Sequence, residues 1–332
     1  MGSLNNQQLI FSENAIKTLI EKQYGFNCRS CTPITYALSA TYRIDTIDTV
    51  YIFKIYLNKH RTMAEVEEEV GLLAILSTKS RSVTSPLFDR SGKAVQNINT
   101  TEGLRYAVLF TLAKGVEQLK LSAEQLTTVG REIAIIHKAT LGLQLRYERR
   151  EFTIDVMLAE PVAGLKPVFA EMQNEYNYLC NAAKIVMNAY RKLDLTAFGY
   201  GYCHNDLHPL NFHFQEDGRV TIFDFELASK GYFVNDLTSF YSHYYRQIML
   251  GVITRQEAAS AYQIFLNSYG EIRPNVYQEL SAFPFIGFAI WVYYTYYDYK
   301  NFDTPPYPDY FKDQFRWIQL WMEWYVLPVL QK

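Results

Sequence analysis

Asp206, Asn211 and Asp224 carry oxygen atoms that could bind a divalent cation, and they lie close together in the sequence. Strand-like residues separate the last two, and Asp217-Gly218 at their centre is a strong hairpin signal. If these two residues alone form the loop, Asn211 lies directly opposite Asp224, with the two Cβ atoms ~5 Å apart. Amide and carboxylate oxygens are ligands that Mg²⁺ prefers, so the spacing predicts a magnesium site.

Asp206 precedes the predicted hairpin, on a segment where Pro209 disfavours a continuing helix. We therefore expect its carboxylate to be free to face the magnesium site. There it could accept the proton of an attacking hydroxyl group, while the cation neutralises charge that develops on phosphate oxygens. Two protein ligands leave most of the Mg²⁺ octahedron open for nucleotide phosphates and water.

The residues before this segment predict a small β-sheet that carries a helix. Ser12 is a typical helix cap, and a short helix is expected over residues 12–23. Val66 and Leu73 belong to an apolar series at helical spacing, which predicts a helix over residues 64–77. Strands rich in β-branched and aromatic residues are expected over residues 36–47, 49–56, 83–89 and 105–110.

The pattern turns helical after a short joint near residues 110–116. Ser122 and Gln125 form a capping-box pattern, and the apolar face that follows predicts a helix reaching Thr140. A longer helix is expected over residues 172–193. A chain of 332 residues is long enough for two compact lobes with a small-molecule site.

The composition excludes several classes of function. The net charge is −2 and the pI is near 6.3, and no run of Lys and Arg could follow a nucleic-acid backbone. Nucleic acid is therefore not an expected partner. Four cysteines are too few for a disulfide scaffold, and the first residues lack the features of a secretory signal, so a cytoplasmic location is expected.

Two segments invite interpretations that the sequence does not favour. The stretch from Leu280 to Tyr297 is uncharged, but it contains Pro284 and ends in many tyrosines. A helix buried in an aromatic-rich lobe is the better interpretation, and no membrane span is expected. Cys28 and Cys31 have a redox or zinc spacing, but no second pair follows, which favours chance. Their role is left open.

The spacing His204-x-Asp206-x-x-x-x-Asn211 resembles the catalytic loop of the aminoglycoside phosphotransferase and choline kinase family. Asp224 begins an Asp-Phe-Glu sequence that is similar to the metal-binding segment of the same family. The predicted helix over residues 121–137 is also similar to the family helix that follows the hinge. The segment over residues 204–226 is highly specific to this family.

The resemblance covers roughly residues 30–300. It implies an α+β, bilobal protein-kinase-like fold, with a small β-sheet N-terminal lobe that carries one helix and a larger, mostly helical C-terminal lobe. Residues 1–112 would bind the nucleotide, and residues 113–332 would hold the catalytic residues and the acceptor. The implied enzyme is a kinase that uses ATP and Mg²⁺ to phosphorylate a hydroxyl group of a small molecule.

The resemblance also implies a role for each site residue. Asp206 becomes the catalytic base, and Asn211 and Asp224 become metal ligands. These roles agree with the chemistry that the three residue types predict. The residues implied to support the site are His204, Glu226 and Asp236.

The nucleotide contacts are implied by the resemblance in the first lobe. Lys54, on a predicted strand, matches the lysine that pairs with the α and β phosphates. Glu69, on the inward face of the predicted helix, matches the residue that orients this lysine. Phe110–Lys114 matches the hinge whose backbone holds adenine, with Phe110 and Leu112 as the implied contacts.

The chain departs from the family pattern at two positions. The loop that should cover the nucleotide, near residues 36–41, contains no glycine, so the preference for ATP or GTP is open. Glu226 stands where protein kinases have glycine, a variant that is common among small-molecule kinases.

Aromatic residues in the C-terminal third suit an acceptor with a positive charge, through cation–π attraction of roughly 0.5–2 kcal/mol per ring. Glu226 or Asp298 could supply a carboxylate beside them. Such an acceptor would be an amino alcohol, an amino sugar or a homoserine-like metabolite. The alternative is that the rings fill the core. The aromatic residues concerned are Trp291, Tyr293, Tyr294, Tyr296, Tyr297, Tyr299, Trp317, Trp321, Trp324 and Tyr325.

Other functions fit parts of this pattern. A serine/threonine protein kinase of the stress-response type would need an open groove for its substrate. A non-catalytic nucleotide-binding module is expected to lack Asp206, Asn211 or Asp224, and all three are present. A metal hydrolase would use His204, Asp206 and His208 as ligands. This interpretation leaves the pairing of Asn211 with Asp224, Lys54 and the hinge unexplained. The sequence leaves open whether the chain is a monomer or a homodimer.

Overall fold

The computed structural model divides into two compact units. The first unit comprises residues 1–115, 145–148 and 221–223, and the second unit comprises the other residues. The structure describes residues 12–36, 39–56, 61–100, 103–147, 149–302 and 304–331.

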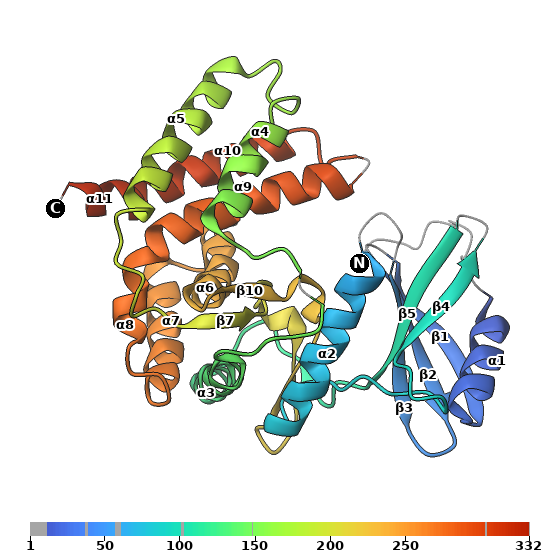
Figure 1. Cartoon of the computed structure of the whole chain (residues 1–332). Helices are drawn as coiled ribbons and strands as arrows, with labels where there is room; N and C mark the ends of the chain where they lie inside the picture. The colour runs from blue at the N-terminus through green and yellow to red at the C-terminus, as the bar shows by residue number, and fades with distance from the viewer. Residues whose placement is uncertain are drawn as a thin grey trace. The chain divides into compact units, whose positions relative to one another are not determined.

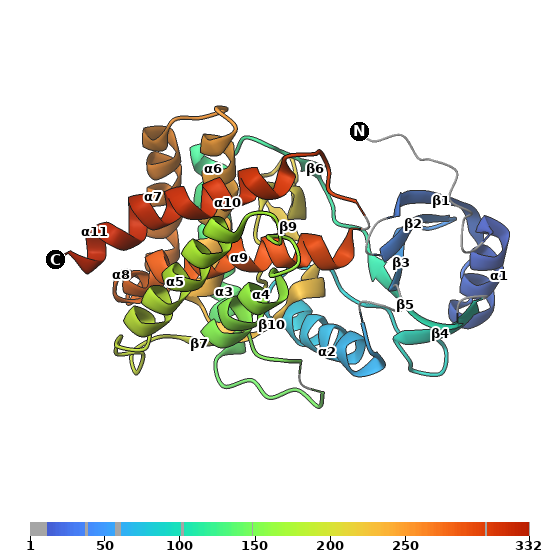
Figure 2. The ribbon, with the colours of Figure 1, turned by 90° about the horizontal axis from the view of Figure 1, so that it is seen from above.

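The first unit is built on an antiparallel five-stranded sheet in the order β1-β2-β3-β5-β4 (Figure 1). The helices α1 and α2 lie on either side of this sheet in both ribbon views (Figures 1 and 2). The elements are α1 (Glu13–Tyr24), β1 (Cys28–Tyr36), β2 (Ser39–Thr46), β3 (Val50–Tyr56), α2 (Met63–Lys79), β4 (Val95–Thr100) and β5 (Gly103–Thr111).

The helix α1 covers one face of the sheet because its apolar residues share one side. Ile16 and Ile20 pack in one buried cluster with Phe53 of β3 and Leu109 of β5. The predicted cap is confirmed, since the Ser12 hydroxyl oxygen accepts a hydrogen bond from a first-turn backbone N–H (3.2 Å). The apolar series that predicted α2 is buried as well.

The predicted sheet was incomplete. Neither β1 nor β4 was predicted, and residues 83–89, predicted as a strand, form only isolated bridges at Val83 and Pro86. Proline explains part of this result, because it cannot donate a backbone N–H to a neighbouring strand. Pro33 lies within β1, where a position at the edge of the sheet tolerates it.

The second unit is mostly helical (Figure 1). Short strands form two small sheets, one of β7 with β10 and one in the order β6-β8-β9. Residues 221 and 222 of β9 belong to the first unit. The elements are β6 (Val116–Glu117), α3 (Ala123–Thr140), α4 (Glu160–Gly164), α5 (Gln173–Tyr190), β7 (Tyr200–Cys203), β8 (Phe212–Phe214), β9 (Val220–Ile222), β10 (Ser229–Tyr232), α6 (Val234–Met249), α7 (Arg255–Gly270), α8 (Val276–Glu279), α9 (Phe283–Asn301), α10 (Tyr310–Trp321) and α11 (Leu327–Leu330).

The helices α3 and α7 pack closely because α3 carries a glycine where they meet. A Cβ atom on Gly130 would lie 2.1 Å from Ser268 Oγ and 2.4 Å from the carbonyl oxygen of Phe265. A larger residue would therefore push the two helices apart. The close approach lets His137 Nδ1 of α3 reach the hydroxyl group of Tyr269 on α7 (2.8 Å).

The uncharged stretch that begins at residue 280 forms the buried helix α9, as predicted. Trp321 packs over Gly287, and its Nε1 donates a hydrogen bond to the carbonyl of Pro284 (2.8 Å). The rings of Trp291 and Trp317 are buried with centroids 5.5 Å apart, so these three tryptophans fill the core. No helix in the described part of the chain is long and apolar enough to cross a membrane.

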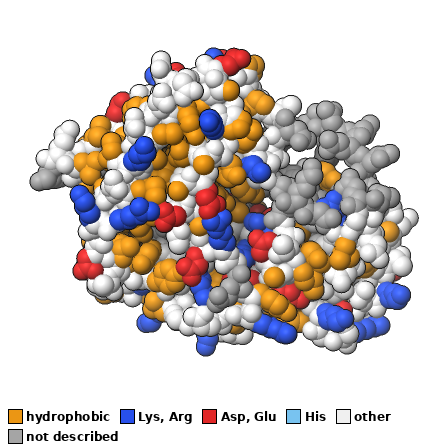
Figure 3. Space-filling view, turned by 45° about the horizontal axis from the view of Figure 1, so that its top comes forward, with side chains coloured by type: hydrophobic (Ala, Val, Ile, Leu, Met, Phe, Trp, Pro, Cys, Tyr) orange, Lys and Arg blue, Asp and Glu red, His pale blue; other side chains and the backbone are white. Residues whose placement is uncertain are grey.

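Charges of both signs are mixed on the face drawn in Figure 3. Lys and Arg side chains alternate there with Asp and Glu side chains among hydrophobic groups. The mixture agrees with the small net charge of −2.

His243 of α6 makes the stability of the fold sensitive to pH. Burial, together with the positive charges of His208 and Arg246, lowers the pKa of His243 from 6.5 to about 4. The neutral ring accepts a hydrogen bond from the Gln247 side-chain amide (2.7 Å). Only the unfolded chain binds a proton near pH 6.5, so the free energy of unfolding should fall as the pH decreases from 6.5 towards 4.

The test is urea unfolding of wild type and His243→Gln at pH 7 and pH 5. Wild type should lose about 2 kcal/mol more of its free energy of unfolding between these pH values than the variant does. Groups that do not interact with His243 contribute equally to both proteins, so the difference reports the titration of this ring together with its coupling to His208. An identical pH dependence of the two proteins would contradict the lowered pKa.

Candidate active site

The loop that contains Asp206 is held by the first turns of α6. Asp236 accepts hydrogen bonds from the backbone N–H groups of His204 (2.7 Å) and Asn205 (2.6 Å). Ser239 lies about one turn later in α6, and its Oγ accepts a hydrogen bond from the backbone N–H of Leu207 (3.2 Å). Asp236 is only 1% exposed, so its bonds are shielded from water and fix the backbone on which Asp206 stands.

Asp206 and Asn211 contact each other. Asn211 Nδ2 donates to the backbone carbonyl of Asp206 (2.9 Å) and lies 3.3 Å from its carboxylate Oδ2. His208 Nε2 lies 3.4 Å from the same Oδ2 atom and 3.2 Å from Asn211 Nδ2. The Asp206 side chain is 31% exposed and the Asn211 side chain is buried, so a substrate can reach the carboxylate while the amide stays fixed.

The hairpin after Asn211 has a three-residue loop, so the predicted two-residue loop is wrong. The N–H of Gln215 donates to the carbonyl of Arg219 (2.9 Å), and the N–H of Gly218 donates to the carbonyl of Gln215 (3.0 Å). Gly218 adopts φ +82°, which lets it occupy the last loop position. The pairing therefore moves by one residue, and Asn211 does not lie directly opposite Asp224.

Asp224 lies where β9 ends, and its side chain is exposed. Its φ of +63° and ψ of +61° place it in the left-handed region, which a non-glycine residue adopts only when its surroundings impose it. Burial of the His208 ring disfavours its protonated form. A hydrogen bond to Asp206 and the charges of Asp206 and Asp224 outweigh this effect and raise the pKa of His208. Both carboxylates therefore lie within electrostatic range of one imidazole.

The donor set of these residues fits a hard divalent cation. The Asn211 amide nitrogen faces the Asp206 carbonyl, and the oxygen of a planar amide points away from its nitrogen. The Asn211 amide oxygen and the exposed Asp224 carboxylate are both hard oxygen donors, and their binding of a cation stays a prediction.

The residues predicted to bind the nucleotide belong to the first unit. Lys54 lies on β3 and Glu69 on α2, and both side chains are buried, which is rare for charged residues. Phe110 is buried on β5, and Leu112 follows the end of this strand with a partly exposed side chain. Nucleotide binding by these residues stays a prediction.

A buried hydrogen-bond network supports the loop over residues 204–211, the candidate catalytic loop. Asp236 Oδ2 also binds His137 Nε2 (2.9 Å), whose other ring nitrogen reaches Tyr269. Asp236 lies in the first turn of α6. The His204 ring packs against Phe225, with centroids 4.5 Å apart, so this histidine supports the loop through its backbone and its ring.

The described residues do not bring together the three ligands that the metal-hydrolase alternative requires. Among the described residues, only His137, Cys203 and Asp236 form a group of His, Cys, Asp or Glu side chains close enough to share an ion. Burial raises the pKa of the Cys203 thiol well above its usual value, and the other two residues already bind each other. This group is therefore a packed core network. Of the predicted hydrolase ligands, Asp206 and His208 approach each other, but His204 does not complete a set of three.

Tyr294 of α9 is a site residue that the sequence did not single out. Its hydroxyl group lies 3.2 Å from Ser239 Oγ and 3.5 Å from the carbonyl oxygen of Asn205, next to Asp206. The sequence placed it only among many aromatic residues. No local pattern could have separated it from its neighbours, because its partners lie 55 and 89 residues away.

The antiparallel sheet of the first unit and the mostly helical second unit, with Asp206 beside Asn211, define a kinase-like α+β protein. The model of the phosphotransferase enzyme family matches residues 30–280, and the chain belongs to this family. The predicted family and fold are confirmed.

Two relatives are similar to this chain over about two thirds of its length. An uncharacterized protein of Synechocystis sp. is 26% identical over 229 residues, which cover 68% of this chain and 63% of that protein. The match thus spans less than two thirds of this relative's length. Amicoumacin kinase of Bacillus subtilis is 26% identical over 235 residues, which cover 69% of this chain and 67% of that protein.

Solved structures of similar proteins confirm the fold. Amicoumacin kinase hAmiN, in complex with AMP-PNP, Ca²⁺ and Ami, superposes with a TM-score of 0.73 at 18% identity, over 94% of each chain. A microcompartment-associated aminopropanol kinase superposes with a TM-score of 0.72 at 18% identity, over 93% of this chain and 94% of that chain.

Proposed function

We propose that this chain is a kinase that transfers the terminal phosphoryl group of ATP to a hydroxyl group of a small, amine-bearing metabolite, with Mg²⁺ as cofactor. The observation that carries this proposal is the contact of a reachable Asp206 carboxylate with a fixed Asn211 amide. The names of the similar proteins, amicoumacin kinase and aminopropanol kinase, support a small acceptor.

Each residue of the site has a role in this reaction. Asp206 accepts the proton of the acceptor hydroxyl while the new O–P bond forms and the bond to the leaving ADP breaks. Asn211 and Asp224 would hold Mg²⁺ through oxygen atoms, and the bound cation neutralises charge on the phosphate oxygens. Lys54, oriented by Glu69, would contact the α and β phosphates.

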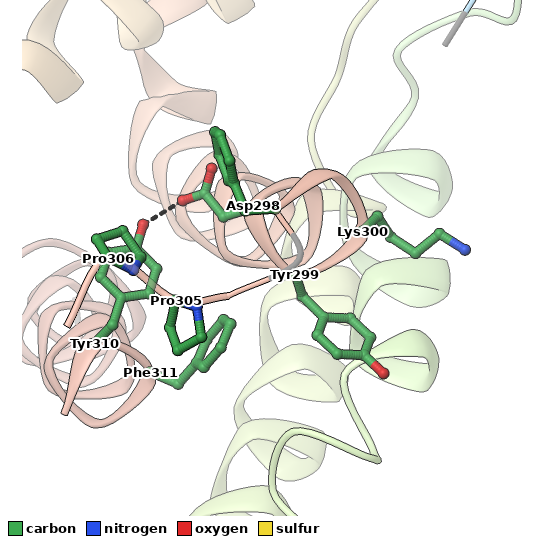
Figure 4. A pocket seen from close by; sticks show the side chains of 8 residues that line it. Asp298, Tyr299, Lys300, Pro305, Pro306, Tyr310 and Phe311 are labelled. Carbon is green, nitrogen blue, oxygen red and sulfur yellow. Dashed lines mark hydrogen bonds between the residues drawn. The ribbon is translucent and has the colours of Figure 1, made fainter. Parts of the chain in front are cut away.

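A cavity in the second unit suits a small acceptor. Its volume is about 410 Å³, within the range of small-molecule sites. Figure 4 shows the Asp298 carboxylate turned towards Tyr310, whose hydroxyl group donates a hydrogen bond to it, while the Lys300 ammonium extends away. Tyr299 and Phe311 line the cavity with aromatic rings.

The helix α9 connects this cavity to the catalytic loop. Tyr294 contacts the residue before Asp206, and burial together with the charge of Asp206 raises the pKa of Tyr294. Asp298 follows four residues later, on the same face of the helix and ~6 Å along its axis. This spacing supports a position in which the acceptor amine binds near Asp298 and the acceptor hydroxyl group reaches Asp206.

The charge of Asp298 favours an amine on the acceptor. Burial raises the pKa of the Asp298 carboxyl, although the hydrogen bond from Tyr310 and the charge of Arg246 oppose this shift. A bound ammonium group would stabilise the carboxylate, because it places a positive charge in direct contact with it. Cation–π attraction to the lining rings acts in the same direction. Amino alcohols and amino sugars are the acceptors that combine this amine with a hydroxyl group.

An ADP-release assay with ATP and Mg²⁺ tests the proposal against amino alcohols, amino sugars, homoserine and a generic protein substrate. We expect turnover with a small amine-bearing acceptor and weaker turnover with the analogue in which hydrogen replaces the amine. Asp298→Asn should raise KM for that acceptor by roughly tenfold or more, because a charged hydrogen bond is lost. The KM for ATP should not change.

The matched control is Asp309→Asn, which removes an exposed carboxylate that pairs with Lys312. Its KM for the acceptor should equal that of wild type. Turnover of the protein substrate alone would instead support a serine/threonine protein kinase. Failure of wild type to bind any nucleotide would refute the proposed function.

A further inference from the structure

A buried arginine binds the turn that directly follows Asp224. Arg149 Nη1 donates to the carbonyl oxygens of Glu226 (2.6 Å) and Ala228 (2.9 Å), and it lies 3.4 Å from that of Phe225. Arg149 is only 8% exposed. Burying a guanidinium group is costly unless its donors are satisfied, so this arrangement commits the side chain to the backbone of residues 225–228.

The strained backbone of Asp224 requires such support. Its left-handed conformation persists only if the chain on either side is held in place. Asn205 holds the same turn from the catalytic loop, since its Nδ2 donates to the carbonyl of Leu227 (3.1 Å) and to Ser229 Oγ (3.0 Å). Arg149 and Asn205 thus bind successive carbonyl groups of one short segment.

The segment that carries Arg149 is itself anchored a few residues later. The N–H of Phe152 donates to the carbonyl of Lys230 (2.9 Å), and Asn235 Nδ2 donates to the carbonyl of Phe152 (3.2 Å). The guanidinium group therefore reaches the turn from backbone that β10 and α6 hold in place.

We infer that Arg149 is a positioning residue that sets the affinity of the site for its divalent cation, by holding Asp224 in its left-handed conformation. The inference rests on the proposed function, because it takes Asp224 as a metal ligand. Partners that orient metal ligands typically change metal affinity by 10- to 100-fold when they are removed. A purely structural arginine would affect the melting temperature without affecting this affinity.

The experiment measures Mn²⁺ binding without turnover. Mn²⁺ is titrated into the enzyme–ADP complex, and free Mn²⁺ is followed by electron paramagnetic resonance. We expect Arg149→Met to weaken Mn²⁺ binding by roughly tenfold or more, while ADP affinity in EDTA stays within about twofold of wild type. Arg149→Lys keeps a charged donor but loses the planar fork, so its affinity should be intermediate.

Arg150→Met is the matched control. It removes the neighbouring guanidinium group, which pairs with exposed Glu160 away from this turn, and it should bind Mn²⁺ like wild type. If Arg149→Met does not fold, the Mn²⁺ affinity of Arg149→Lys and Arg149→Gln is measured in its place. Wild-type affinity in a folded Arg149 variant overturns the inference alone. Failure of wild type to bind Mn²⁺ with ADP overturns both the inference and the proposed metal site.

Discussion

Replacing Asp206 with Asn should lower kcat by roughly 10³-fold, with little change in stability. The amide that replaces the carboxylate has the same shape but cannot accept the proton of the attacking hydroxyl group. The Asp206 side chain is partly exposed, and its contacts with Asn211 Nδ2 (3.3 Å) and His208 Nε2 (3.4 Å) can still form with an amide oxygen. Steady-state kinetics with the acceptor found by the ADP-release assay measure the effect.

Asp217→Asn provides the control for this experiment. Asp217 lies in the loop of the adjacent hairpin, where its carboxylate pairs with Arg219 at the surface. Its replacement should leave kcat and both KM values unchanged. If Asp206→Asn turned over as fast as wild type, another group would have to accept the proton, and the assignment of the base would be wrong. ADP binding by the variant separates a chemical defect from a loss of nucleotide affinity.

Replacing Asp236 with Ala should lower the free energy of unfolding by roughly 4 kcal/mol. The substitution leaves the N–H groups of His204 and Asn205 without their acceptor in the buried interior. It also removes the partner of His137 Nε2, whose ring is fully buried. Activity should fall with stability, because the same bonds position the loop that carries Asp206.

Urea unfolding at pH 7 measures this loss. Asp194→Ala is the matched control, since Asp194 also accepts a backbone N–H, from Thr196, but does so at the protein surface (3.0 Å). Its effect should be small, because water replaces the lost hydrogen bond. A fold that tolerates Asp236→Ala as well as this control would show that the buried network contributes little.

Local signals predicted the helices well. Ser12 and Ser122 precede helices with regular apolar faces, and both accept the capping hydrogen bonds that the sequence predicted. Such signals arise within one turn of the chain, so they depend little on the rest of the fold. The predicted boundaries of α3 and α5 accordingly lie within a few residues of the observed ones.

The strands and the hairpin depended on interactions that no short segment contains. The Asp217-Gly218 signal identified a hairpin but not its loop length, because glycine in the left-handed region serves two- and three-residue loops alike. The site still gathers Asp206, Asn211 and His208, although the pairing that predicted a metal site was shifted by one residue. The five-residue spacing between Asp206 and Asn211 predicted their contact better than the hairpin pairing predicted the position of Asp224.

Arg149 marks the limit of what the sequence could predict about the site. Its acceptors lie 76 to 79 residues away, and no motif in its neighbourhood indicates that its side chain is buried. An arginine in a connecting segment is ordinarily exposed to solvent, as the adjacent Arg150 is. Only the folded chain reveals that this guanidinium binds the turn beside Asp224.

The proline in β1 has a consequence for the behaviour of this chain at high concentration. An open sheet edge can recruit a strand from another molecule, which is a common route to aggregation. Pro33 removes one N–H from this strand, and the pairing of β1 is irregular both after Cys28 and between Pro33 and Thr35. A foreign strand would therefore find no continuous set of donors and acceptors, and this interrupted edge protects the sheet from intermolecular pairing.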